Sequence, residues 1–133
     1  MIIHAGDIVE VAALKQLETI SPVIAVHGNR YSDELKASLP ESRIVELKGF
    51  KIGILHGHGE KGTTMDRLPG FFKGSSLDCI IFGHSHIPFN QKIGSTLYFN
   101  PGSPTVKKRQ RFPSVGIITL DEAITADIQF LTE

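Results

Sequence analysis

Four short apolar stretches of this chain each end beside a glycine and a polar residue. The four junctions are Gly6-Asp7, Gly28-Asn29, His56-Gly57 and Gly83-His84-Ser85-His86. The apolar stretches are typical of short buried strands, and a glycine lets the backbone turn sharply where each strand ends. In open α/β sheets, binding sites form in the crevice beyond the carboxyl ends of the strands. The pattern therefore predicts an α/β fold with a polar site at one edge of a sheet.

The residue types at these junctions are those that bind transition metals. Asp7 offers a carboxylate and Asn29 an amide oxygen, while three imidazoles come from His56, His84 and His86. Side chains two residues apart in an extended segment point the same way, so both histidines of the last junction can face one cleft. Mixed oxygen and imidazole donors suit Mn, Fe, Zn or Ni. We expect these five residues to be metal ligands; for the last junction taken alone, a surface turn is the alternative.

The remaining pattern predicts strands that alternate with helices at first and then follow one another. Strands are expected at 1–5, 22–27, 43–47, 50–55, 77–82, 88–93, 96–99, 115–120 and 126–131, and helices at 8–20, 32–39 and 63–72. Lys48-Gly49 and Gly94-Ser95 are typical of hairpin turns. No repeat, linker or low-complexity segment interrupts the chain, so we expect a single domain over residues 1–133.

Composition narrows the location and the partners that we expect. The chain holds 14 Lys and Arg against 14 Asp and Glu, so no net charge favours nucleic acid or a membrane surface. No apolar run reaches the roughly 18 residues of a membrane span, and the N-terminus lacks the layout of a signal peptide. The single cysteine, Cys79, excludes an internal disulfide and fits a cytoplasmic protein. Its apolar neighbours indicate a buried structural thiol rather than a nucleophile.

Taken in order, the four junctions resemble motifs two to five of the calcineurin-like metallophosphoesterases. The resemblance is closest to small single-domain phosphodiesterases, a subgroup that includes the retromer-scaffold relatives, and it extends to residues 49–58 and 99–103. It implies a two-layer β-sandwich flanked by helices, with two metal ions at one end. It further implies that Asp7 bridges both metals, that Asn29, His56 and His84 complete one metal site, and that His86 belongs to the other.

The resemblance also implies an activity. The chain would be a metal-dependent phosphoesterase acting on a phosphodiester or a phosphorylated small molecule, with a metal-bound hydroxide as the nucleophile. A pair of divalent cations lowers the pKa of bound water and neutralises the charge that develops on the phosphoryl group. Asp7, Asn29 and His84 would then be catalytic residues as well as metal ligands.

The family's first motif, an aspartate and a histidine two residues apart after the first strand, has no counterpart before Gly6-Asp7. Without a βα unit of roughly 30 residues, only the metal site of Asn29, His56 and His84 keeps its full set of protein ligands. Either the sequence begins too late and a binuclear enzyme lies behind it, or the chain is a one-metal protein with poor or no turnover. The strand at residues 2–5 would also have an unpaired edge, which predicts a homo-oligomer or poor solubility.

Two further residues are expected to act on the substrate. Arg30 stands after Asn29, where many family members have a histidine that serves as general acid. Arginine cannot donate a proton at neutral pH but stabilises negative charge on a phosphate; the alternative is a solvated loop residue. His58 follows His56 by two residues, so it is expected to contact the substrate phosphate or the metal.

Other polar features have a structural explanation that serves as well as a functional one. His4 either hydrogen-bonds a metal ligand or is an ordinary strand histidine, and His27 is expected to be structural. The segment 100–103 either shapes a pocket wall or is a tight turn. The basic run at 107–111 is expected to be a solvated loop that at most attracts an anionic substrate.

The rival function is a non-catalytic metal-binding scaffold or protein-interaction module with an incomplete site. The missing motif favours this function, whereas the five retained donor residues argue against it. Nucleic-acid binding through residues 107–111 is disfavoured because the neutral chain offers little overall attraction to phosphate.

Overall fold

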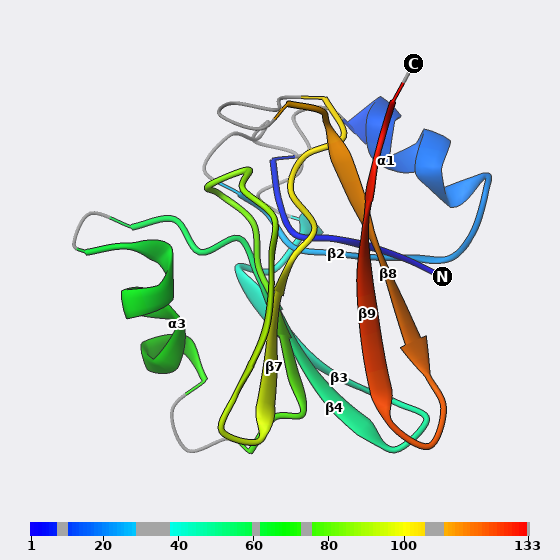
Figure 1. Cartoon of the computed structure of the whole chain (residues 1–133). Helices are drawn as coiled ribbons and strands as arrows, with labels where there is room; N and C mark the ends of the chain where they lie inside the picture. The colour runs from blue at the N-terminus through cyan, green and yellow to red at the C-terminus, as the bar shows by residue number, and fades with distance from the viewer. Residues whose placement is uncertain (8–10, 29–37, 60–61, 73–75, 106–110, 133) are drawn as a thin grey trace.

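The computed structural model of the chain describes residues 1–7, 11–28, 38–59, 62–72, 76–105 and 111–132 (Figure 1). The elements in order are β1 (Ile2–His4), α1 (Val11–Glu18), β2 (Val23–Ala25), β3 (Ser42–Leu47), β4 (Phe50–Leu55), α3 (Thr64–Phe71), β5 (Cys79–Ile81), β6 (Phe89–Ile93), β7 (Thr96–Asn100), β8 (Ser114–Leu120) and β9 (Ile124–Phe130). All nine predicted strands are present, some a residue or two shorter at their ends. Residues 32–37 of the helix expected at 32–39, and residues 8–10 of the helix expected at 8–20, lie outside the described residues.

The strands form one large sheet and two pairs. The large sheet has the order β3-β4-β5-β7-β6, in which β4, β5 and β7 run parallel and the two edge strands close antiparallel hairpins. Both hairpins were predicted, and the turn of the first has positive φ at Lys48 (50°) and Gly49 (84°), as a tight two-residue hairpin requires. The β1–β2 pair is parallel, and β8–β9 is an antiparallel hairpin.

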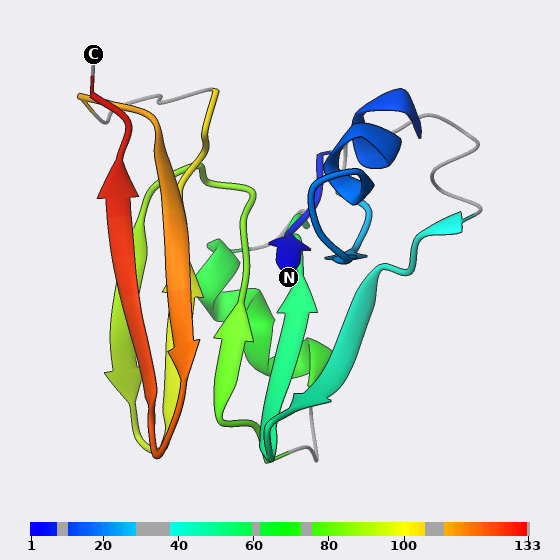
Figure 2. The same cartoon turned by 90° about the vertical axis from the view of Figure 1, so that its right-hand side faces the viewer.

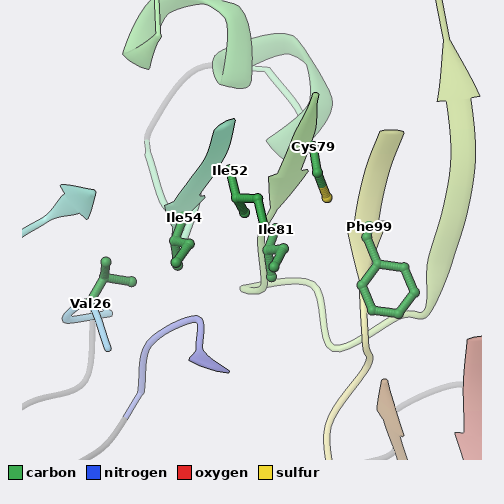
Figure 3. Close-up of a cluster of buried hydrophobic side chains, with 6 residues drawn as sticks. All are labelled: Val26, Ile52, Ile54, Cys79, Ile81 and Phe99. Atoms are coloured by element: carbon green, nitrogen blue, oxygen red, sulfur yellow. The ribbon is translucent and has the colours of Figure 1, made fainter. Parts of the chain in front are cut away.

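One face of the large sheet packs against the two strand pairs. Alternate residues of β4 and β5, such as Ile52, Ile54 and Ile81, point to this face and are at most 4 % exposed. Figure 3 shows them with Val26, Cys79 and Phe99 in one cluster. Apolar residues of β1, β2, β8 and β9 cover this cluster, so the two layers form a β-sandwich.

The opposite face of the sheet packs against α3, which lies on the far side of the sheet from β8–β9 in Figure 1. Leu68 and Phe72 from this helix meet Leu55, Ile80 and Phe82 from the sheet. Thr63 caps α3, and the helix continues through Pro69-Gly70 to Phe71. Figure 2 shows α1 beside the β1–β2 pair, where Leu14 packs on Ala25. The predicted α/β fold, a two-layer β-sandwich flanked by helices, is thus confirmed.

Cys79 lies in the sandwich core with no exposed surface. Burial, with the nearby Asp78 carboxylate as a second cause, raises the pKa of its thiol to about 12. The thiol is therefore protonated at neutral pH, in line with the structural role predicted for it. In the part of the chain that the structure describes, no helix has the length and apolar character needed to cross a membrane.

Candidate metal centre

The carboxyl ends of β1, β4, β5 and β7 are tied together by a chain of hydrogen bonds. His56, just after β4, donates from Nδ1 to the Ala5 carbonyl after β1 at 2.8 Å. The Gly83 N–H after β5 donates to the His56 carbonyl at 3.0 Å. Asn100, the last residue of β7, donates from Nδ2 to the Gly83 carbonyl at 3.1 Å. Four strand ends therefore meet at one place. Those of β1, β4 and β5 are predicted glycine junctions, and that of β7 is not.

Among the candidate ligands that the structure describes, His56 is the most buried, at 2 % exposure. Because a carbonyl can only accept, its Nδ1 carries the hydrogen and its Nε2 presents a lone pair. Burial lowers the pKa of His56 from 6.5 to about 4, although the bond to Ala5 and the Asp7 charge act in the opposite direction. At neutral pH His56 is therefore a neutral imidazole, the form that binds metals.

The lone pair of His56 faces two other candidate ligands. Its Nε2 lies 3.4 Å from Asp7 Oδ2 and 3.2 Å from His84 Nδ1. His84 can donate from Nδ1, but Asp7 Oδ2 and His56 Nε2 are both acceptors, so a positive charge between them would be favourable. His86 Nε2 lies 3.8 Å from the same Asp7 oxygen. Bonds of about 2.0–2.2 Å from each donor to a shared cation would span all of these separations.

The described residues nevertheless do not form a finished metal cage. Within ranges 1–7, 11–28, 38–59, 62–72, 76–105 and 111–132, no group of three or more His, Cys, Asp or Glu side chains is arranged to hold an ion. Asp7, His56, His84 and His86 are brought together in pairs, while Asn29 and Arg30 lie outside the described residues. The pairs fit a metal in donor type and spacing, and a cation would need small movements of their side chains.

Several residues of the centre have an unusual backbone. Asp7, His84 and His86 have φ of 64°, 67° and 60°, in the left-handed region that non-glycine residues rarely occupy. Gly6 and Gly57 also have positive φ, 107° and 93°. Strain of this kind persists only where the surroundings impose it, and it gathers at functional sites.

Two glycines are required by the close packing of this centre. A Cβ on Gly6 would lie 2.5 Å from His56 Nδ1, and a Cβ on Gly28 would overlap the Asp7 carboxylate and backbone nitrogen. These junction glycines therefore do more than permit a turn. Because they have no side chain, they leave the space that the side chains of His56 and Asp7 occupy.

The remaining histidines lie around the centre. The His58 ring centroid is 5.5 Å from that of His56 and 6.5 Å from that of His84, and its Nδ1 is buried without a hydrogen-bond partner among the described residues. His27 lies beside it at 6.2 Å. His4 accepts a hydrogen bond from the Gly6 N–H at 3.2 Å, so it shapes the turn that carries Asp7.

Sequence reasoning missed the role of Arg67 in α3. Its guanidinium donates to the Gly57 carbonyl from Nε at 3.1 Å and from Nη2 at 2.8 Å, and to the Gly62 carbonyl at 2.7 Å. It thereby holds the loop between His56 and α3. The available signal was its position four residues after the cap Thr63, which turns it toward the start of its own helix.

Comparison with known proteins gives consistent results. The model of the calcineurin-like phosphoesterase superfamily domain matches residues 1–123. A probable metallophosphoesterase from Methanothermobacter thermautotrophicus is 37% identical over 131 residues, which are 96% of this chain and 74% of that protein. A phosphodiesterase from Methanocaldococcus jannaschii is 26% identical over 133 residues, 91% of this chain and 76% of that protein.

Two solved structures share the fold. A Thermotoga maritima protein is 30% identical with a TM-score of 0.72, over 97% of this chain and 79% of its own. Vps29 from Entamoeba histolytica, in complex with Zn²⁺, has a TM-score of 0.72 at 19% identity, over 96% of this chain and 80% of its own. At that identity the second likeness concerns the fold alone.

Proposed function

Because the chain belongs to the calcineurin-like phosphoesterase superfamily, we propose that it is a metal-dependent phosphoesterase whose substrates are phosphodiesters. The observation that carries the proposal is the meeting of Asp7, His56 and His84 at the strand ends, with His56 Nε2 within 3.4 Å of both partners. The related phosphodiesterase from M. jannaschii supports the substrate class.

The donor set suits a divalent cation such as Mn, Ni, Fe or Zn. Such a cation polarises a phosphoryl oxygen and lowers the pKa of a nearby water, which supplies a nucleophile at neutral pH. In this proposal one cation would be held by Asp7, Asn29, His56 and His84. His86 would belong, together with Asp7, to a second cation site. Asn29 enters from the sequence alone, because it lies outside the described residues.

The chain's own groups would supply orientation and charge. Burial keeps the His56 imidazole neutral, and the bond from its Nδ1 to Ala5 aims its Nε2 lone pair at the centre. Arg30, which also enters from the sequence alone, would stabilise the negative charge of the phosphate as it reacts. It cannot protonate the leaving oxygen, so substrates with a good leaving group are favoured.

We assign His58 to the substrate phosphate rather than to the metal. Nitrogens of His56 and His84 lie 3.2 Å apart, whereas the ring centroid of His58 is 5.5 Å from that of His56 and 6.5 Å from that of His84. We expect His58→Ala to raise the KM for a phosphodiester while Mn²⁺ binding stays unchanged. A loss of Mn²⁺ affinity would instead place His58 among the metal ligands.

Hydrolysis of bis-p-nitrophenyl phosphate with added Mn²⁺ or Ni²⁺ tests the main proposal. Asp7→Asn and His84→Ala should abolish it. Thr96→Val is the matched control, because the Thr96 hydroxyl donates to the Leu77 carbonyl at the opposite end of β7 from the centre. Rates in Asp7→Asn and His84→Ala equal to those of the control would remove the assignment of the site.

The second candidate is a non-catalytic metal-binding scaffold or protein-interaction module. It is favoured by the lack of any finished group of three His, Cys, Asp or Glu donors within the described residues. Metal content after purification, followed by the hydrolysis assay, separates the two. Bound metal with no hydrolysis in any metal supplement would support the scaffold, and metal-dependent hydrolysis lost in Asp7→Asn would exclude it.

A further inference from the structure

The loop that carries His84 and His86 is held in a conformation that it would not adopt by itself. Both histidines have left-handed φ, 67° and 60°, with only Ser85 between them. The Ser85 N–H donates to the Gly83 carbonyl at 2.8 Å, so the chain reverses within three residues around His84. A three-residue turn with positive φ at its centre is rare and strained. Something outside the loop must therefore impose it.

The buried side chain of Asn100 makes the contacts that can do this. Its Nδ2 donates to the Gly83 carbonyl at 3.1 Å and to Ser85 Oγ at 3.2 Å, on either side of His84. Ser85 Oγ in turn accepts from the Ile87 N–H at 3.2 Å, beyond His86. The amide of Asn100 has no exposed surface, so these bonds do not compete with water.

Asn100 is itself fixed in place and in orientation. Its Oδ1 accepts from the Gly102 N–H at 2.9 Å, so the amide cannot flip and its two N–H groups must face the loop. The Phe82 N–H donates to the neighbouring Phe99 carbonyl, which joins β7 to the start of the loop. Ser114 Oγ donates a hydrogen bond at 2.7 Å to the carbonyl of Pro101, the residue after Asn100.

We infer that Asn100 is a positioning residue, which imposes the left-handed turn that presents His84 and His86 to a divalent cation. The inference about the loop stands on its own geometry, and its consequence for metal binding rests on the proposed function. Supporting residues of this kind typically change metal affinity by about 10- to 100-fold when they are replaced. The alternative is that Asn100 only caps its own turn through Gly102.

Asn100→Asp separates these two roles, because aspartate keeps the oxygen that accepts from Gly102 but cannot donate to Gly83 or Ser85. Its added negative charge would by itself attract cations, so a loss of affinity cannot be a charge effect. Ser85→Ala is the second variant, which removes one of the two bonds of Asn100 and also the acceptor of the Ile87 N–H. In this variant, therefore, only the amide of residue 85 reports on the role of Asn100. Thr96→Val is the control, since it removes a side-chain hydrogen bond on the same strand about 13 Å away.

The experiment measures two quantities in protein freed of metal. Amide hydrogen exchange at Ser85 and Ile87 reports on the loop, and calorimetric titration with Mn²⁺ reports on binding. We expect Asn100→Asp to speed exchange at these two amides, with core amides of β5 unchanged, and to raise the Mn²⁺ Kd by about 10- to 100-fold. Ser85→Ala should show a smaller change of the same kind at the amide of residue 85 and in the Mn²⁺ Kd, and Thr96→Val should match the wild type.

The outcomes distinguish the inference from the proposed function. Wild-type exchange and wild-type Mn²⁺ affinity in Asn100→Asp would overturn the positioning role, as would equal effects in Thr96→Val. If the wild type binds no Mn²⁺, the proposed function fails, and exchange at Ser85 and Ile87 still decides whether Asn100 holds the loop. If Asn100→Asp does not fold, the amide of residue 85 decides in Ser85→Ala: unchanged exchange there overturns the inference, and faster exchange there supports it.

Discussion

Gly6→Ala is expected to damage the candidate centre without altering any candidate ligand. The new Cβ would lie 2.5 Å from His56 Nδ1 and 2.8 Å from two carbon atoms of the same side chain. For ordinary contact at 3.4 Å, the ring must retreat by about 0.9 Å. The ring cannot move so far and keep its 2.8 Å bond to Ala5, so its Nε2 would turn away from Asp7.

The size of the effect follows from two separate causes. Alanine at a φ of 107° costs on the order of 1–3 kcal/mol of backbone strain. Overpacking against His56 adds about 1–3 kcal/mol. A displacement near 1 Å at a reacting centre lowers activity by about 100-fold. We expect Mn²⁺ affinity to fall steeply for the same reason.

Gly49→Ala supplies the matched control, because Gly49 has a φ of 84° but nothing within 4 Å of the added Cβ. It incurs the backbone strain without the overlap. Urea unfolding of the metal-free variants should show Gly6→Ala less stable than Gly49→Ala by about 1–3 kcal/mol. Mn²⁺ titration should show weakened binding in Gly6→Ala only. Equal stability and equal affinity in the two variants would refute the packing argument.

Three further predictions concern pH, metal content and assembly. Because the folded chain lowers the pKa of His56 from 6.5 to about 4, the metal-free protein should keep its full stability above pH 6.5. It should lose up to about 3 kcal/mol as the pH falls to 4; an equal slope in His56→Gln would contradict this. The 133-residue chain should bind about one equivalent of Mn²⁺ tightly, none in Asp7→Asn, as measured by calorimetry; two tight equivalents would show that the second site is also complete. Among the described residues β1 pairs only with β2, so its open edge should give concentration-dependent self-association in size-exclusion chromatography, which a sharp, stable monomer peak would disprove.

The strands and their ends could be predicted because both depend on local pattern. Alternate apolar residues such as Ile52 and Ile54 identify a strand with one face in the sandwich core, and a glycine beside a polar residue indicates where it stops. The meeting of His56 and His84 follows from the rule that parallel strands of one sheet end at one edge; that of Asp7 does not, because β1 pairs with β2 outside that sheet. These inferences need no knowledge of distant contacts.

The supporting contacts could not be predicted in the same way, because they join residues far apart in the chain. The bond from His56 to Ala5 spans 51 positions, and the bond from Asn100 to Gly83 spans 17. Which nitrogen of His56 carries the hydrogen depends on the first of these bonds. The left-handed φ of His84 depends on the second. Asn100 carried a weak signal, since it is a polar strand end followed by Pro101-Gly102, like the other junctions.

These contacts determine how readily the centre holds a proton in place of the proposed metal ion. His56 Nε2 and Asp7 Oδ2 are two acceptors 3.4 Å apart, and a proton on Nε2 would turn their repulsion into a hydrogen bond. Burial, however, lowers the pKa of His56 to about 4. At neutral pH that proton is therefore absent, and the Nδ1 hydrogen is committed to Ala5. A divalent cation, if bound there, would interact with both acceptors at once. The burial of His56 thus makes the site poor at holding a proton and keeps the imidazole in the neutral form that binds metals.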